Sequence, residues 1–221
     1  MTGSPPHRAC LIDALGTTVR LRPPWEEVDP ALVAGLPPTV VRQAFGAEMS
    51  FYADHAHRAT DRERLVKLRE RCAAILATGL GRPVSVEGLM GSIAFESYED
   101  APRALEVLRG LGLRLVCVSN WDFELPQVLE RVGLGGRFDG IVSSAAAGAR
   151  KPDPEIFRAA LHVAGCAADE AIHVGDSDVD VEGAEAAGIE VLRIDRKGGG
   201  DIASLDEIAP RLRPASPIRE H

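Results

Sequence analysis

The stretch CLIDALGTTVR, from Cys10 to Arg20, decides how this chain folds. Its apolar residues run without interruption into one carboxylate, Asp13, and a glycine and two threonines follow Leu15. A short apolar run bounded by turn-forming residues is typical of a strand that a parallel sheet buries on both faces. Open α/β sheets bind their ligands beyond the carboxyl ends of such strands, so we expect Asp13 to lie in a binding crevice.

Four more apolar runs follow the same pattern in the second half of the chain. These four runs are LRLVCVS (113–119), FDGIVSS (138–144), AIHVGD (171–176) and EVLRID (190–195), and with RACLID (8–13) they make five expected strands. Helical patterns separate them: one covers 102–111, one begins with Asp153 as N-cap and Pro154 at the first position, and one follows Ser177. This alternation predicts an α/β fold, a doubly wound, Rossmann-like parallel sheet with helices on both faces.

Residues 23–97 interrupt the alternation. They contain no convincing strand. Helical patterns cover about 39–59 and about 85–95, and a third helical pattern begins at a capping box formed by Thr60 and Glu63. We therefore predict a core made of residues 1–22 and 98–214, an inserted helical cap domain at 23–97, and a flexible tail at 215–221.

Composition limits the classes of partner. The chain has 221 residues, 45% of them apolar, which is enough for one large domain with an insertion. Its 25 Lys and Arg against 33 Asp and Glu give a net charge of −8, which disfavours nucleic acid and anionic lipid. No apolar run approaches the roughly 18 residues of a membrane span, and the start MTGSPPHRA lacks the apolar segment of a signal peptide, so a cytoplasmic protein is expected.

Polar side chains gather after the expected strand ends. They are Asp13, Gly16 and Thr17; Ser119 and Asn120; Arg150 and Lys151; and Asp176, Ser177, Asp178 and Asp180. Mg²⁺ prefers oxygen ligands, which Asp13, Asp176 and a backbone carbonyl supply. Lys151 and Ser119 would then face the oxygens of a phosphate. Asp13 could attack its phosphorus, giving an aspartyl-phosphate that water hydrolyses.

Four motifs in this order resemble those of the haloacid dehalogenase-like hydrolase superfamily, in the branch with a helical cap between the first two motifs. They are DALGTT (13–18), VSN (118–120), ARKPDPEIF (149–157) and GDSDVDVEGAEAAG (175–188). The resemblance runs from about Arg8 to Leu212, and SNWD beside KPDPEIF resembles the phosphatase-like members. It implies the strand order 5-4-1-2-3, counted along the chain, and a cap that closes over the site.

The resemblance also implies roles for individual residues. Asp13 is the implied nucleophile and Lys151 the other catalytic residue. The implied phosphate-binding residues are Thr17, Ser119, Asn120 and Lys151, and the implied Mg²⁺ ligands are Asp13, Asp176 and the backbone carbonyl of Leu15, with Asp180 in support. The expected substrate is a small phosphorylated metabolite, and the sequence defines neither its identity nor the oligomeric state of the protein.

Leu15 is the departure from the pattern of phosphatase members, which usually carry a second aspartate at that place. That aspartate donates a proton to the leaving alcohol and then activates water, a role typically worth about 10²- to 10⁴-fold in rate. An enzyme without it can act on acyl or aryl phosphates, whose leaving groups need little protonation, or use another acid. His55 and His57 are the candidates in the cap, although a pair on the solvated face of a helix is the simpler explanation.

Three other interpretations stay open. A 2-haloacid dehalogenase also lacks the second aspartate, but those enzymes place a tyrosine there, use no metal and lack the acidic cluster of GDSDVD. A phosphonate hydrolase carries a small apolar residue at this place but needs a cap lysine, and Lys67 lies in a charged run typical of a solvated helix. A third possibility is a weakly active or non-catalytic binding module that keeps the fold.

Overall fold

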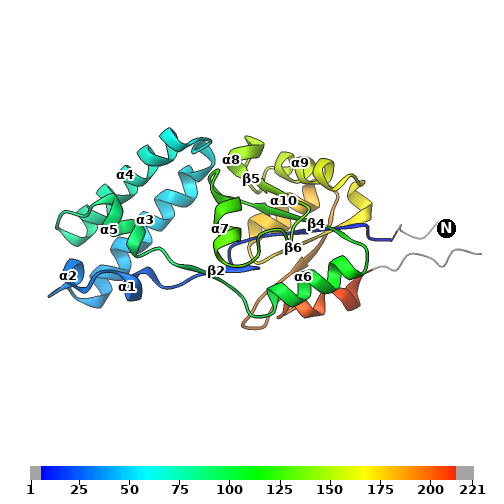
Figure 1. The fold of residues 1–221 in the computed structure, drawn as a ribbon, viewed down its shortest axis with the longest axis horizontal. Helices are drawn as coiled ribbons and strands as arrows, with labels where there is room; N and C mark the ends of the chain where they lie inside the picture. The colour runs from blue at the N-terminus through cyan, green and yellow to red at the C-terminus, as the bar shows by residue number, and fades with distance from the viewer. Residues whose placement is uncertain (1–5, 213–221) are drawn as a thin grey trace, which may run out of the picture.

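The computed structural model describes residues 6–212, and its centre is a five-stranded parallel sheet (Figure 1). The strands are β1 (Ala9–Ile12), β4 (Arg114–Ser119), β5 (Gly140–Ser143), β6 (Ala171–Gly175) and β7 (Glu190–Arg193). They pair in the order β5-β4-β1-β6-β7. This order confirms the topology and the fold class expected from the sequence. β1 is central, with β4 and β6 as its neighbours.

Helices cover both faces of the sheet because the side chains of β1 alternate between two hydrophobic clusters. Cys10 and Ile12 pack with α6 (Ala101–Gly110) and α7 (Leu125–Arg131) on one face. Leu11 packs with α9 (Pro154–Ala164) and α10 (Asp178–Ala186) on the other. The remaining short elements of this part are α8 (Ser144–Ala147) and the 3-10 helices η2 (Ala168–Glu170), η3 (Leu205–Glu207) and η4 (Ala209–Arg211).

The segment expected to be helical forms a separate group of helices at one end of the sheet. They are α1 (Pro24–Glu27), α2 (Pro30–Val33), α3 (Pro38–His55), α4 (Arg62–Leu80) and α5 (Val86–Gly91), with the 3-10 helix η1 (Ala56–Arg58). This helical unit has its own hydrophobic cluster, in which Phe45 of α3 and Leu76 of α4 are fully buried. The expected capping box was wrong by one residue: Asp61 caps α4, accepting from the backbone N–H of Arg64 at 2.9 Å.

The expectation that residues 23–97 hold no strand was also wrong. β3 (Phe95–Ser97) pairs antiparallel with β2 (Val19–Leu21), so the chain enters and leaves the helical unit through a two-stranded ribbon. Arg20 and Glu96 face each other across it, 2.7 Å apart. Each strand is only three residues long, too short for an alternating pattern to show in the sequence.

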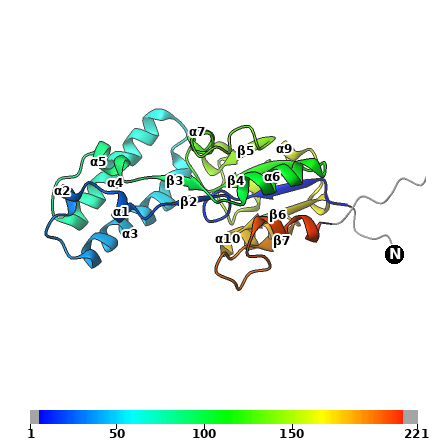
Figure 2. The ribbon, with the colours of Figure 1, turned by 60° about the horizontal axis from the view of Figure 1, so that its bottom comes forward.

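The carboxyl end of β1 points toward the helical unit in both ribbon views (Figures 1 and 2). The predicted site therefore lies where the sheet and the helical unit meet. Within residues 6–212, none of the helices has the length and apolar character needed to cross a bilayer. The tail expected at 215–221 lies outside the described residues.

Candidate active site

The loop after β1 holds Asp13 at the carboxyl end of the strand. Asp13 is 5% exposed, and its N–H donates to the Val174 carbonyl of the neighbouring β6 at 2.9 Å. The Thr18 hydroxyl donates to the Asp13 carbonyl at 3.0 Å and closes the loop. Gly16 has a φ of +86°, and a Cβ at this position would lie 2.1 Å from Oδ2 of Asp176. The loop therefore needs glycine here, both for its left-handed backbone and for its close approach to Asp176.

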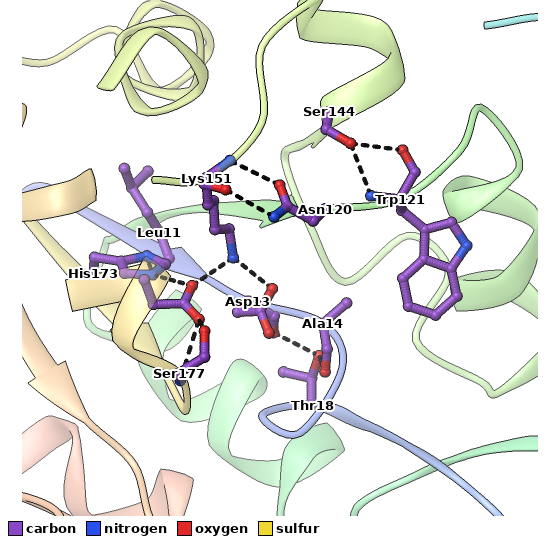
Figure 3. A network of polar contacts seen from close by, with 11 residues as sticks. Leu11, Asp13, Ala14, Thr18, Asn120, Trp121, Ser144, Lys151, His173 and Ser177 are labelled. Carbon is purple, nitrogen blue, oxygen red and sulfur yellow. Dashed lines mark hydrogen bonds and ion pairs between the residues drawn. The ribbon is translucent and has the colours of Figure 1, made fainter. Parts of the chain in front are cut away.

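Lys151 links two carboxylates at the centre of the site (Figure 3). Its side chain is 2% exposed, and Nζ lies 2.6 Å from Oδ1 of Asp13 and 2.5 Å from Oδ1 of Asp180. The Asn120 side chain fixes the backbone of Lys151: Oδ1 accepts from the Lys151 N–H at 2.8 Å, and Nδ2 donates to its carbonyl at 3.1 Å. An ammonium buried to this degree requires partners of opposite charge, and the two aspartates supply them.

Asp13, Asp176 and Asp180 form an acidic cluster in which one oxygen of each residue lies within 4.8 Å of the others. Burial raises the pKa of Asp13 to about 6, although Lys151 opposes the shift. Burial and the charge of Asp180 also raise the pKa of Asp176. Three carboxylates against one ammonium leave an excess of negative charge. A hard divalent cation such as Mg²⁺ fits this donor set, which consists of converging carboxylate oxygens, and its charge would offset the excess.

His173 is a site residue that the sequence analysis missed. It lies fully buried on β6, with Nε2 2.9 Å from Oδ1 of Asp180 and Nδ1 3.1 Å from the Leu11 carbonyl. Burial raises the pKa of Asp180, but the Lys151 ammonium and the hydrogen bond from His173 outweigh it and hold that pKa below its usual range. From the sequence, His173 is expected only to be a strand residue within AIHVGD. A polar residue inside an otherwise apolar buried strand is the signal that could have identified it.

The residues expected to bind phosphate lie around Asp13 but differ in their partners. Thr17 is completely buried, and its hydroxyl lacks a hydrogen-bond partner within the described chain. Such an unsatisfied buried hydroxyl is uncommon and is consistent with a ligand-binding role. Ser119 is buried at the end of β4. The side-chain amide of Asn120 is engaged by the Lys151 backbone, so the structure gives it a positioning contact, and its expected contact with phosphate stays a prediction.

Leu15 is 42% exposed and borders a cavity of about 460 Å³ between the helical unit and the sheet. Neither of the two candidate acids of the cap, His55 and His57, is among the residues that line this cavity.

The other singled-out residues of the helical unit have partners within it. The His55 ring stacks on Phe51, and its Nδ1 lies 2.8 Å from the Phe51 carbonyl. Lys67 is exposed and pairs with Glu63 at 2.5 Å, as expected for a solvated helix face.

Comparisons with known proteins identify the family of this chain. Residues 7–188 match the model of the haloacid dehalogenase-like hydrolases. The chain belongs to this family. It is 46% identical over 128 residues, 58% of its length, to haloacid dehalogenase-like hydrolase domain-containing protein 3 of Bos taurus, of which it covers 47%. It is 37% identical over 92 residues, 41% of its length, to a phosphoglycolate phosphatase of Aquifex aeolicus, of which it covers 43%.

A solved structure shares the fold of this family member. A dehalogenase crystallised with an intermediate complex superposes with a TM-score of 0.71 over 94% of this chain and 98% of the other, at 22% identity. At that identity the likeness supports the fold alone. The chain spans about half the length of the curated relatives it matches.

Proposed function

We propose that the protein is a Mg²⁺-dependent phosphatase that forms an aspartyl-phosphate on Asp13 and acts on a small phosphorylated metabolite. The observation that carries this proposal is the convergence of Asp13, Lys151, Asp176 and Asp180 at the carboxyl end of the sheet. The phosphatase names of several relatives support the reaction class.

In this proposal the residues of the chain divide the work. Lys151 holds Oδ1 of Asp13, which leaves the second carboxylate oxygen to attack phosphorus. The bond from phosphorus to the ester oxygen breaks as the bond to Asp13 forms, and water then hydrolyses the aspartyl-phosphate. Thr17, Ser119 and Lys151 bind the phosphate oxygens. Asp13, Asp176 and the Leu15 carbonyl would hold Mg²⁺, with support from Asp180, and the ion would supply positive charge that stabilises the transferred phosphate.

We further propose that residues 23–97 act as a cap. Three side-chain contacts connect the helical unit to loops after the strands: Tyr52 to Asp122 at 2.7 Å, Arg69 to Glu124 at 2.6 Å and Arg150 to Asp54 at 3.6 Å. These contacts support a closed position in which the cap excludes water from the site. Opening of this cap would then admit the substrate and release the product.

Hydrolysis of acetyl phosphate, with and without Mg²⁺, tests the proposal. Its leaving group needs little protonation, so the missing acid at Leu15 does not limit this reaction. We expect turnover that requires Mg²⁺ and falls by about 10³-fold or more in Asp13→Asn. Hydroxylamine should trap the aspartyl-phosphate as a hydroxamate at residue 13, detected by mass spectrometry. Turnover that survives Asp13→Asn, or a hydroxamate at another residue, would rule out the mechanism.

A further inference from the structure

We propose that the cavity beside Leu15 binds an apolar, ring-sized leaving group, so that the substrate is an aryl phosphate, the phosphate monoester of a phenol. This inference rests on the proposed function, because it names the substrate class of the same site. The cavity touches the catalytic loop at Leu15 and the loop after β4 at Asn120, so an ester with its phosphate near Asp13 would extend its organic part into this space.

Most of the cavity wall is apolar and comes from both parts of the molecule. The helical unit supplies Met49, Leu89 and Met90, and the sheet side supplies Leu15, Trp121 and Val128. Trp121 lies against Phe95 of β3 with ring centroids 5.1 Å apart, so two adjacent aromatic rings line the cavity. The volume of about 460 Å³ lies in the range of small-molecule sites, roughly 300 to 1,000 Å³. A two-carbon acid would leave most of it unfilled.

Three charged residues of the wall, Arg69, Asp122 and Glu124, are paired with other protein groups. The Tyr52 hydroxyl donates to Oδ2 of the buried Asp122, 2.7 Å away, and the Glu124 N–H donates to its Oδ1 at 2.7 Å. Arg69 pairs with Glu124 at 2.6 Å.

Two further charged residues, Glu48 and Arg131, line the cavity. The buried Glu48 carboxyl has a side-chain hydrogen bond with Cys72, and burial raises its pKa. Arg131 is exposed at the end of α7. A charged substrate tail would have to displace one of the pairs or reach that edge, whereas an apolar ring disturbs none of them.

This cavity also gives Leu15 a role beyond the loss of an acid. An apolar side chain between the catalytic loop and the cavity keeps the wall continuous, whereas a carboxylate there would be desolvated by a bound ring. Aryl leaving groups need little protonation, so the same substrate class suits both the apolar wall and the missing proton donor. Leu15→Asp should therefore improve hydrolysis of hydrophilic esters and weaken that of aryl esters.

The test compares kcat/KM for 1-naphthyl phosphate, 2-phosphoglycolate and acetyl phosphate, with Mg²⁺ present. We expect 1-naphthyl phosphate to exceed 2-phosphoglycolate by about 10²-fold, a factor within reach of burying one ring in an apolar site. Met90→Glu should lower the ratio of the 1-naphthyl phosphate to the acetyl phosphate value by about tenfold, because it places a charge in the wall. Val66→Glu, which adds the same charge at a 46% exposed position of α4, is the matched control and should leave the ratio unchanged.

A binding measurement separates this inference from the proposed function. The chain has two tryptophans, so Trp25→Phe leaves Trp121 as the fluorescent reporter in the cavity wall. In the Asp13→Asn background, 1-naphthyl phosphate should quench this fluorescence, and Met90→Glu should weaken the quenching. Acetyl phosphate turnover together with equal or greater activity on 2-phosphoglycolate would overturn the inference and leave the proposed function standing. If none of the three phosphates is hydrolysed, the proposed function fails. Quenching of the Trp121 fluorescence by 1-naphthyl phosphate then still tests the ligand class, and absence of quenching would overturn the inference.

Discussion

The His173 imidazole lies 2.9 Å from the Asp180 carboxylate, behind the carboxylate oxygen that also contacts Lys151. The other ring nitrogen faces the Leu11 carbonyl, so both partners of the ring are acceptors. Gly175 makes room for this arrangement, since a Cβ there would lie 2.3 Å from Cγ of Asp180. Contacts therefore run from His173 through Asp180 and Lys151 to Asp13, and we expect His173 to position Asp13.

Two amide substitutions test this chain of contacts. His173→Gln can keep a donor near Asp180, whereas His173→Asn can keep only the donor toward the Leu11 carbonyl. We expect His173→Asn to lower kcat by about tenfold or more with little change in KM, and His173→Gln to restore part of the loss. Steady-state kinetics on acetyl phosphate measure both values. Equal loss in the two variants, matched to equal loss of thermal stability, would mean that His173 only packs.

Lys151→Met should destabilise the fold strongly. The substitution leaves Asp13 and Asp180 buried without their ammonium partner, a change that typically costs about 3 to 5 kcal/mol. Urea unfolding measures the free energy directly. Lys67→Met is the control: this lysine is exposed on α4 and, among residues 6–212, pairs with Glu63 alone, so its loss should leave the stability nearly unchanged. Similar effects of the two substitutions would contradict the role of the buried ion pairs.

Gly16→Ala should damage the site more than the fold. Gly16 and Gly35 both have positive φ values, +86° and +75°, so alanine costs about 1 to 2 kcal/mol of backbone strain at either position. Only at Gly16 would the new Cβ also meet Asp176, whereas Gly35 has open space around it. We expect Gly16→Ala to reduce kcat/KM by about 10²-fold, as displaced site groups do, and Gly35→Ala to affect the melting temperature alone. An active Gly16→Ala enzyme would show that the position of Asp176 is not critical.

The Asp100 carboxylate provides a prediction with a defined pH dependence. It accepts from Arg196 at 2.9 Å and from the Ser204 hydroxyl at 2.8 Å, and Arg196 also donates to the Thr17 carbonyl at 2.5 Å. Burial raises the pKa of Asp100, but the hydrogen bonds from Arg196, Ser204 and Leu205 outweigh it and lower that pKa below 3.8. A depressed pKa means that the carboxylate stabilises the fold above the unfolded value and that this contribution is lost as the pH falls through the folded value.

Asp100→Asn should therefore lower the free energy of unfolding by about 1 to 3 kcal/mol near neutral pH and by progressively less below about pH 4. Thermal unfolding of the two proteins across this range measures the difference. Glu63→Gln, which removes an exposed ion pair on α4, should change little at any of these pH values. A difference between native protein and Asp100→Asn that grows toward acid would have the wrong sign.

The sequence alone determined the sheet and the residues at its carboxyl edge. Buried parallel strands appear as uninterrupted apolar runs, and the residue after each run lies at a common edge whatever the loops do. Asp13, Ser119 and Asp176 could therefore be found one strand at a time, whereas Lys151 follows α8 and was found through the ARKPDPEIF motif. The N-cap at Asp153 was equally readable, since its contact spans only two residues.

Contacts between residues distant in the sequence were decided only by the tertiary structure. The β2–β3 ribbon joins segments 76 residues apart, and the three-residue strands carry no pattern of their own. His173 stands out in the sequence as a polar residue in an apolar strand, but its partner Asp180 does not, because their contact forms only when α10 packs against β6. From the sequence alone, Leu15 indicates only a missing acid. The structure places an apolar cavity beside it. A cavity depends on how two packed surfaces meet, and no local sequence pattern encodes that.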